Sequence, residues 1–429
     1  MLTNSQGYPT VDDLVRGARE VVRRHPEVCG LREVGRSRAG DPLWLVSVGD
    51  PGPGDRNILV VAGPHANEPA GGATALHLAA VLSREPRLRS GLTWHFLLCL
   101  DPDGARINEG WVREPGDPAD YFRGMYRPVT DGQPEWLPPA GRAPLPETAA
   151  LVRLLNEYRP LAQFSLHAND VGGTWIQTTE PLPAVAAMFA KTATELDIPL
   201  EIAPFDAFHM PSPAPGVFVM PEPDASASGV PRNDLSARST WFHPVPGGTV
   251  TVLIEATQWA VPEIADATPV ADPPAELTRL VAGFRRRTAR LAELVELAAP
   301  WLDSDHVRRG PLAASARWVA QGCAEIADEW AGGLAAASRA ALARTAGNAA
   351  ALRLTAHRLS LRAAGMLARA LPPGRDTDGV RRAVLGQFDA WYTEFEAETK
   401  PRWVPVRDQV ELQSRTILAV AADLDGVRG

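Results

Sequence analysis

Two histidines and a glutamate of this sequence have the spacing of a metal site. His65 and Glu68 lie three residues apart, just after the apolar run of residues 57–62, and His167 directly follows the run of residues 161–166. Imidazole nitrogens and carboxylate oxygens are ligands that zinc prefers, and a site with three protein ligands leaves a position open for water. The same ligands also accept manganese, cobalt or nickel. The three residues therefore predict a site for one divalent cation.

A second carboxylate, Glu255, follows the apolar or β-branched run of residues 249–254. An acid at the end of such a run costs free energy unless it is paired or used in chemistry. A merely solvated carboxylate at a strand end is the alternative interpretation. Glu255 is therefore a candidate functional residue.

These side chains need a fold that brings the ends of separate strands together. Short apolar runs alternate with helical stretches between residues 43 and 254, which favours a mostly parallel sheet with helices on both faces. Ligands of such sheets bind beyond the carboxyl ends of the strands, where we expect His65 and His167 to meet. The expected strands are residues 43–48, 57–62, 93–100, 161–166, 174–178 and 249–254, and the expected helices are residues 71–82, 146–158 and 182–196.

The chain divides into two predicted domains. Residues 1–268 hold the α/β pattern, and residues 274–429 show the helical spacing of an all-α C-terminal domain, built as a bundle of antiparallel helices. We expect this helical domain to cover an edge of the sheet or to form a homodimer, with substrate gating as the alternative. Residues 204–248 lack any period and predict a long loop, either a pocket wall or lid or a solvated insertion.

Composition excludes several classes of partner. The chain has 429 residues and a formal net charge of -8, so we expect neither nucleic acid nor an anionic membrane surface as partner. No apolar run reaches the ~18 residues of a membrane span. Three cysteines without C-x-x-C pairing exclude a disulfide framework and predict a cytoplasmic protein. Because Lys191 and Lys400 are the only lysines, arginine or a metal ion must supply any positive charge that the chemistry needs.

Six fragments in order resemble the zinc metallocarboxypeptidase family with its H-x-x-E metal motif, over roughly residues 31–259. They are Gly35 to Leu43, His65-Ala66-Asn67-Glu68, Asp101-Pro102-Asp103-Gly104, Pro146-Glu147-Thr148, Ser165-Leu166-His167 and Val252-Leu253-Ile254-Glu255. The resemblance implies an α/β fold with a mixed, mostly parallel twisted sheet flanked by helices. It also implies one Zn²⁺ ion bound by His65, Glu68 and His167, with Glu255 as general base and proton shuttle.

The resemblance leaves the substrate-binding arginines open between several positions. For the oxyanion, the first candidate is Arg106, with Arg113 behind it. The family's asparagine–arginine pair, which grips a substrate carboxylate, is matched by the segment ending in Phe122-Arg123, where Phe122 takes the asparagine position. Arg123 and Arg127 are therefore both candidates for a bidentate carboxylate contact.

Two further positions depart from the family's pattern. The arginine that often lies within the H-x-x-E motif is Asn67 here. The family's clamp tyrosine has no counterpart, because no tyrosine lies between Tyr158 and Tyr392. His243, in the loop before Glu255, is a candidate replacement, and an ordinary solvated histidine is the alternative.

The leading functional prediction is a zinc-dependent, carboxypeptidase-like hydrolase that cleaves a peptide or amide bond next to a carboxylate-bearing residue. The departures from the family's pattern leave open a deacylase or amidase, near the aspartoacylase type, that acts on an N-acyl amino acid or a biosynthetic intermediate. A non-catalytic scaffold with a retained fold is the third hypothesis. The presence of His65, Glu68, His167 and Glu255 together disfavours the scaffold.

Overall fold

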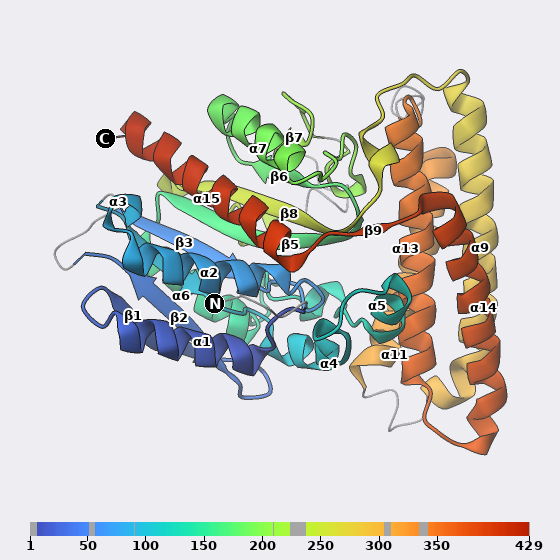
Figure 1. The fold of residues 1–429 in the computed structure, drawn as a ribbon. Helices are drawn as coiled ribbons and strands as arrows, with labels where there is room; N and C mark the ends of the chain where they lie inside the picture. Colours follow the sequence, from blue (N-terminus) through green and yellow to red (C-terminus); the bar gives the residue numbers. More distant parts are fainter. Residues whose placement is uncertain are drawn as a thin grey trace.

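The computed structural model describes residues 7–50, 56–89, 91–208, 210–223, 237–303, 310–333 and 342–428. In these ranges a sheet with helices on both sides lies beside a bundle of long helices (Figure 1). The strands of the sheet are β1 (Cys29–Arg36), β2 (Pro42–Val48), β3 (Asn57–Ala62), β4 (Thr93–Leu97), β5 (Ala162–Gly172), β6 (Trp175–Thr178), β7 (Val217–Val219), β8 (Val250–Ala260) and β9 (Arg402–Trp403).

The sheet of the described residues is mixed and has a parallel centre. Its strand order is β1-β2-β4-β3-β5-β8-β6-β7, with β9 paired to β8. The central strands β4, β3, β5 and β8 are parallel to one another, whereas β2 joins β4 and β6 joins β8 in the antiparallel sense. The predicted α/β class, a mixed sheet flanked by helices, is confirmed.

Two central strands are longer than expected. The predicted strands over 161–166 and 249–254 continue to Gly172 and Ala260. Polar residues follow both apolar runs and read as strand ends, but in the folded chain they continue the pairing of β5 with β8. His167 and Glu255 therefore lie within strands and not at their ends.

The helices around the sheet include the three that were expected. These are α2 (Ala70–Arg84), α6 (Pro146–Tyr158) and α7 (Pro183–Glu195). The sequence did not predict α1 (Val11–Arg24), α3 (Pro86–Arg89), α4 (Pro102–Val112) or α5 (Pro118–Gly124), nor the short 3₁₀ turns η1 (Thr130–Gly132) and η4 (Pro262–Ala265). α1 begins with a capping box of Thr10 and Asp13, which was a readable signal.

The expected long loop over residues 204–248 is partly regular. Its described part contains η2 (Phe205–Ala207), the short strand β7 and η3 (Val245–Gly247). Residues 209 and 224–236 of that expectation lie outside the described residues.

The helical region forms a bundle, but its last helix leaves it. The bundle contains α9 (Pro273–Leu302), α11 (Pro311–Asp328), the π turn η5 (Glu329–Gly333), α13 (Ala346–Ala370) and α14 (Arg375–Thr399). α15 (Val406–Arg428) instead lies along the sheet (Figure 1), where Leu412, Ile417 and Val420 share a core with Ile58 and Val60 of β3. The expected division at 274–429 therefore does not describe α15, because its apolar face is buried on the sheet.

The bundle and the sheet region are also joined by a continuous core. Tyr121 and Phe122 of α5 and Trp259 of β8 belong to the same buried cluster as Phe284 of α9 and Leu361 of α13. Among the described helices, none combines the length and apolar character needed to cross a bilayer.

Candidate functional site

The site lies where the middle of the sheet opens. β3 pairs with β5 only as far as Ala62 beside Leu166, whereas β5 and β8 stay paired to the ends of both strands. Past Leu166, the edge of β5 is open to the chain that leaves β3. Gly63 turns this chain with a φ of 60°, a left-handed conformation that favours glycine. The next residues, 65–68, therefore lie against β5.

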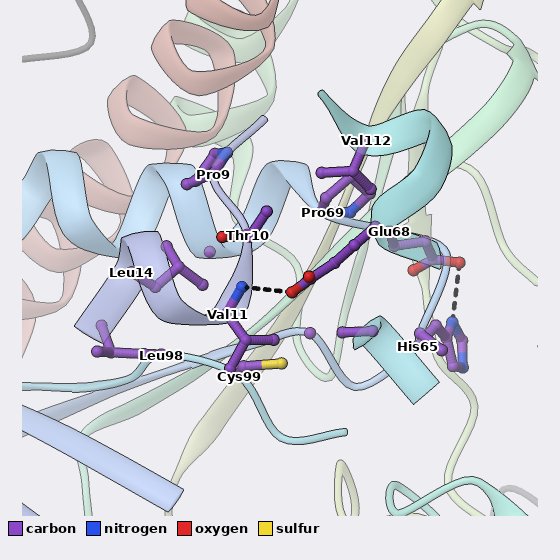
Figure 2. A pocket seen from close by; sticks show the side chains of 15 residues that line it. Pro9, Thr10, Val11, Leu14, His65, Glu68, Pro69, Leu98, Cys99 and Val112 are labelled. Atoms are coloured by element: carbon purple, nitrogen blue, oxygen red, sulfur yellow. Dashed lines mark hydrogen bonds and ion pairs between the residues drawn. The ribbon is translucent and has the colours of Figure 1, made fainter. Parts of the chain in front are cut away.

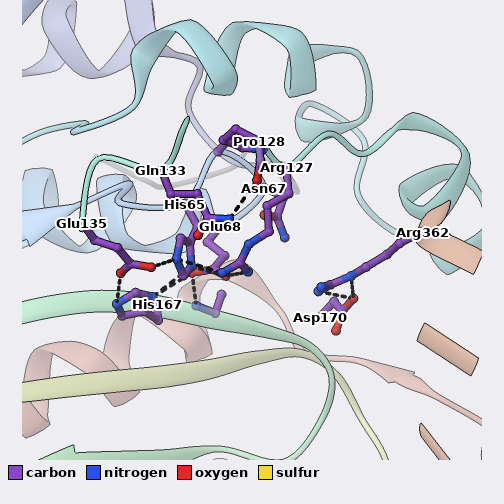
Figure 3. A network of polar contacts seen from close by, with 12 residues as sticks. His65, Asn67, Glu68, Arg127, Pro128, Gln133, Glu135, His167, Asp170 and Arg362 are labelled. Atoms are coloured by element: carbon purple, nitrogen blue, oxygen red, sulfur yellow. Dashed lines mark hydrogen bonds and ion pairs between the residues drawn. The ribbon is translucent and has the colours of Figure 1, made fainter. Parts of the chain in front are cut away.

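His65, Glu68 and His167 meet in this opening (Figure 3). His65 Nδ1 lies 2.9 Å from Glu68 Oε1, His167 Nδ1 lies 3.1 Å from Glu68 Oε2, and the two Nδ1 atoms are 3.2 Å apart. All three residues are buried. The backbone N–H of Ala168 also donates to Glu68 Oε2 at 3.2 Å, which holds the carboxylate between the two rings.

This donor set fits a zinc ion. Two Zn–N bonds of about 2.0–2.1 Å at tetrahedral angles separate their nitrogens by about 3.3 Å. The observed separation of the two Nδ1 atoms is 3.2 Å. Three buried electron-pair donors so close together are most favourable when they share a cation, and two nitrogens with one carboxylate suit zinc.

Two further charged groups cover the outer side of the histidines. The Glu135 carboxylate contacts His65 Nε2 and lies 3.8 Å from His167 Nε2. Arg127 places Nη2 2.8 Å from His65 Nε2 and Nη1 3.1 Å from Glu68. Glu135 could also hold a metal ion with the two histidines, since one donor atom of each lies within 4.8 Å of the others. The Arg127 cation beside Nε2 disfavours a second cation on that side.

The loop of residues 127–135 is tied at its base to the turn that carries His65. Asn108 of α4 donates from Nδ2 to the Ala66 and Tyr126 carbonyls, both at 2.9 Å. This places the start of the loop next to the metal-site turn. The loop has no helical or strand period, so no local pattern predicts that Glu135 belongs to the site.

Glu255 lies beside His167, because the two residues are register partners in the parallel pair β5–β8. It is the only partly exposed position of a strand that is otherwise buried. Burial raises the pKa of Glu255 well above its usual range and the Glu68 carboxylate adds to this effect, while the Arg127 guanidinium opposes it. The structure thus brings His65, Glu68, His167 and Glu255 together.

Without a bound cation, the carboxylates of Glu135 and Glu68 favour a protonated His65. Burial and Arg127 lower the pKa of His65, but Glu135 and Glu68 outweigh them and the net direction is upward. Burial raises the pKa of Glu68, and the two histidines reverse this and hold it well below its usual range. A site that gathers protons in this way releases them when a divalent ion binds, because metal ligands must be deprotonated.

Aromatic side chains border the site. The Trp241 ring lies 6.0 Å from the His167 ring and 5.0 Å from the Trp136 ring, centroid to centroid. His243, the candidate replacement for the clamp tyrosine, contacts Asn156 Oδ1 of α6 at 3.2 Å. The structure gives His243 no contact with the metal-site side chains within the described residues.

The two oxyanion candidates lie away from this centre. Arg106 donates from Nε to Asp41 at 2.7 Å and from Nη2 to Asp12 at 2.9 Å. Arg113 is exposed and lies 3.8 Å from Asp13. The structure therefore does not bring either arginine to the predicted metal site, because the carboxylates of its own neighbourhood bind Arg106 and attract Arg113.

Only one of the two carboxylate-binding candidates reaches the centre. Arg123 donates to Asp389 of α14 at 2.8 Å, and its guanidinium lies 5.0 Å from the centre of the Phe388 ring. It therefore ties α5 to the bundle. Arg127, in contrast, contacts both His65 and Glu68.

A small cavity lies behind the turn that carries His65 and Glu68 (Figure 2). Its volume is about 30 Å³, close to that of one water molecule, and Leu14, Leu98 and Val112 are among its lining residues.

One protein family matches this part of the chain. Residues 15–172 match the family model described as zinc carboxypeptidase. Carboxypeptidase SOL1 of Arabidopsis thaliana is 25% identical over 173 residues, which cover 38% of this chain and 34% of that protein. The chain thus spans about a third of the length of this curated relative.

Solved structures give a weaker likeness. Carboxypeptidase A from Helicoverpa armigera is 13% identical with a TM-score of 0.40, over 59% of this chain and 66% of that chain. A metallo-carboxypeptidase from Burkholderia cenocepacia is 18% identical with a TM-score of 0.38, over 58% of this chain and 60% of that chain. At these scores, neither structure supports the assignment of a role to a residue.

Proposed function

Because residues 15–172 match the family model described as zinc carboxypeptidase, we propose that this protein is a zinc-dependent hydrolase that cleaves a peptide or amide bond next to a carboxylate-bearing residue. The observation that carries the proposal is the convergence of His65 Nδ1, His167 Nδ1 and the Glu68 carboxylate within 3.2 Å of one another. Glu255 lies on the adjacent strand, beside His167.

Each residue of the site has a separate role in this proposal. His65, Glu68 and His167 would hold the ion, and bound zinc polarises a carbonyl and lowers the pKa of water. Glu255 takes a proton from the attacking water and passes it to the leaving nitrogen. Arg127, whose guanidinium already borders His65 and Glu68, stabilises the negative charge that develops on the carbonyl oxygen.

The test uses metal-stripped protein to which zinc is returned. We expect zinc to restore the release of a C-terminal residue from peptides, and Glu255→Gln to lower kcat by about 10²–10⁴-fold because the general base is lost. The exposed pair of Arg32 and Glu157 offers a control, since Glu157→Gln leaves kcat unchanged. Wild-type activity that survives in Glu255→Gln rejects the base assignment.

A second candidate is an amidase or deacylase that acts on N-acyl amino acids. It is favoured by the position of Arg123, which binds Asp389 and leaves the expected carboxylate grip of a peptidase empty. Comparison of a peptide panel with N-acyl amino acids separates the two functions. Rapid release from long peptides would remove the deacylase, and turnover confined to small N-acyl amino acids would remove the peptidase.

Location and assembly remain predictions. Cys29, Cys99 and Cys323 are all unpaired, which suits the proposed cytoplasmic protein. A homodimer through the helical bundle is proposed on the exposure of Leu297 and Trp318, and a sedimentation measurement tests it.

A further inference from the structure

Two arginines of the helical bundle, Arg358 and Arg362, contact the carboxylate of Asp170. Asp170 follows His167 by three residues in the sheet. Asp170 of β5 is fully buried. Arg362 of α13 donates to Asp170 Oδ2 from Nε at 2.9 Å and lies 2.7 Å from it at Nη2, and Arg358 contacts Oδ1 through Nε. Figure 3 shows Arg362 and Asp170 in the same view as the metal-site side chains.

The charge of this group is not balanced by Asp170. Arg362 donates to Asp170 through two nitrogens and already supplies one positive charge for this carboxylate. Arg358 adds a second positive charge, which also acts to lower the pKa of Glu201, against the burial that raises it. The Arg358 side chain is only 17% exposed. Its terminal Nη1 and Nη2 groups make no hydrogen bond within the described part of the chain, and neither is a fully enclosed atom. Four N–H donors therefore remain for a group that arrives from outside.

The helix that carries Arg358 packs on β5, the strand that pairs with the strand of the proposed general base. Asp170 and Glu255 belong to neighbouring paired strands, and α13 packs on β5 and on η2 near residue 206. Burial is the main cause that raises the pKa of Glu255, and the charges of Arg127 and Arg358 both act to lower it. Both guanidinium groups are therefore within electrostatic range of this carboxylate.

We propose that Arg358 is the specificity-determining residue that binds the substrate carboxylate, so that the helical bundle completes the active site. This inference rests on the proposed hydrolase function. The two free terminal nitrogens of an arginine match the two oxygens of a carboxylate in a planar, bidentate contact. Arg123 binds Asp389 and Arg127 contacts His65 and Glu68, so neither offers a free fork.

Arg362 acts in this arrangement as a positioning residue. Its Nε and Nη2 both contact Asp170 Oδ2, while Oδ1 accepts from the Val171 backbone N–H and contacts Arg358 Nε. Asp170 thus holds Arg358 through Nε and not through its terminal nitrogens. Arg362 is the less exposed of the two arginines, at 10% against 17%, and both its Nε and Nη2 already contact Asp170.

The experiment compares one substrate with and without its charge. Zinc-loaded protein is assayed on an N-acyl dipeptide that ends in a carboxylate and on the same compound as a carboxamide. For Arg358→Met we expect KM for the carboxylate to rise by about 100-fold, with a much smaller change in KM for the carboxamide. The matched control is Arg353→Met on the same helix, because Arg353 pairs with Glu263 outside the site; it leaves both KM values unchanged.

A second variant, Arg358→Lys, distinguishes a loss of substrate binding from a folding defect. Arg358→Lys keeps a cation for Asp170 but lacks the planar fork, so we expect at least a 10-fold rise in KM for the carboxylate alone. A loss that affects the carboxylate and the carboxamide equally, in either variant that folds, overturns the proposal. Such a loss would mean that Arg358 only supports the structure.

A binding measurement separates this inference from the proposed function. Zinc-loaded Glu255→Gln protein is titrated with an N-acyl amino acid in a calorimeter, with and without Arg358→Lys. Tight binding that weakens by 10-fold or more in the double variant supports Arg358 even if no substrate is ever hydrolysed. Equal affinity in both proteins overturns the role of Arg358, even where hydrolysis by the wild type is established.

Discussion

At the scale of single residues, the contact between Glu135 and His65 bears on the proposed metal binding. Glu135 contacts the Nε2 atom of His65, on the opposite side of the ring from Glu68. A carboxylate on the second nitrogen of a metal-binding imidazole fixes the orientation of the ring and raises its basicity. Glu135 and Glu68 thus have different parts in holding the same histidine.

We therefore predict that Glu135→Gln lowers the affinity for zinc by about 10–100-fold, because the amide orients His65 less firmly. Competition with a chromogenic chelator measures this affinity. Glu114→Gln, at an exposed position, serves as control. We expect Glu68→Gln to lower the affinity for zinc more than Glu135→Gln does. A larger loss in Glu135→Gln would show that the ion lies on the Nε2 side of His65.

The residues at the centre of the site differ in how far the sequence predicted them. His65 and His167 each follow an apolar run, so the local pattern predicts that they meet, whereas the role expected for Glu255 is implied by the family resemblance. Glu135 lies in a loop without any period, and Arg358 lies on a helix far along the chain. Their places depend on tertiary contacts, which local patterns do not contain.

At the scale of elements, the expected α6 matches the observed helix at both ends, and β3 matches as well. β5 and β8 were predicted too short, because the segments after His167 and Glu255 mix polar with apolar residues. Those polar side chains are buried and bonded in the structure, as with Asp170 on Arg362. Polar residues of a site thus interrupt the apolar run from which a strand is predicted.

The packing of α13 on α5 gives a prediction at this scale. A Cβ atom at Gly365 would lie 1.9 Å from the Phe122 carbonyl oxygen, so Gly365→Ala must push the two helices apart. We expect the free energy of unfolding to fall by about 2 kcal/mol, as measured by urea denaturation.

The matched control is Gly379→Ala on α14, where a Cβ atom would meet nothing within 4 Å. It should raise the free energy of unfolding by about 0.5–1 kcal/mol, because alanine is the better helix former. If the two substitutions change the free energy of unfolding equally, α13 and α5 are not in close contact at Gly365. Because α13 also carries Arg358, Gly365→Ala is further expected to raise KM.

At the scale of the whole molecule, stability should depend on pH through a buried histidine that ties three strands to a helix. Asn57 Nδ2 donates to the Tyr158 carbonyl, so Asn57 Oδ1 accepts from His95 Nε2 at 3.0 Å, and His95 Nδ1 accepts from Ser47 at 2.8 Å. Burial lowers the pKa of His95 to about 4, and Arg32 contributes.

The direction of this pH dependence follows from the difference between the pKa values of His95 in the folded and the unfolded chain. Between pH ~6.5 and ~4 the unfolded chain binds a proton that folded His95 does not bind, so the stability that neutral His95 supports is lost as pH falls through this window. The full difference is about 3 kcal/mol. Urea denaturation from pH 7 to pH 4 should show a smaller decline for His95→Gln than for the wild type. An equal or steeper decline in the variant contradicts this assignment.

The division of the chain at 274–429 stays a prediction, and the final helix of that range lies on the sheet. Composition groups residues 406–428 with the bundle, but their apolar face is buried on the sheet. Only the three-dimensional arrangement shows which of two apolar surfaces a helix covers. The helical bundle and the sheet therefore form parts of one molecule with a shared core.

The same helix sets the order in which the site is completed during synthesis. Gln413 of α15 donates to the carbonyl of His167 at 2.9 Å, across 246 residues of sequence. At ~5–20 residues per second, a ribosome needs roughly 12–50 s to pass from one to the other. During that interval the strand that carries His167 exists without its partner from α15. A nascent chain thus lacks this hydrogen bond of the candidate site until residue 413 has been translated.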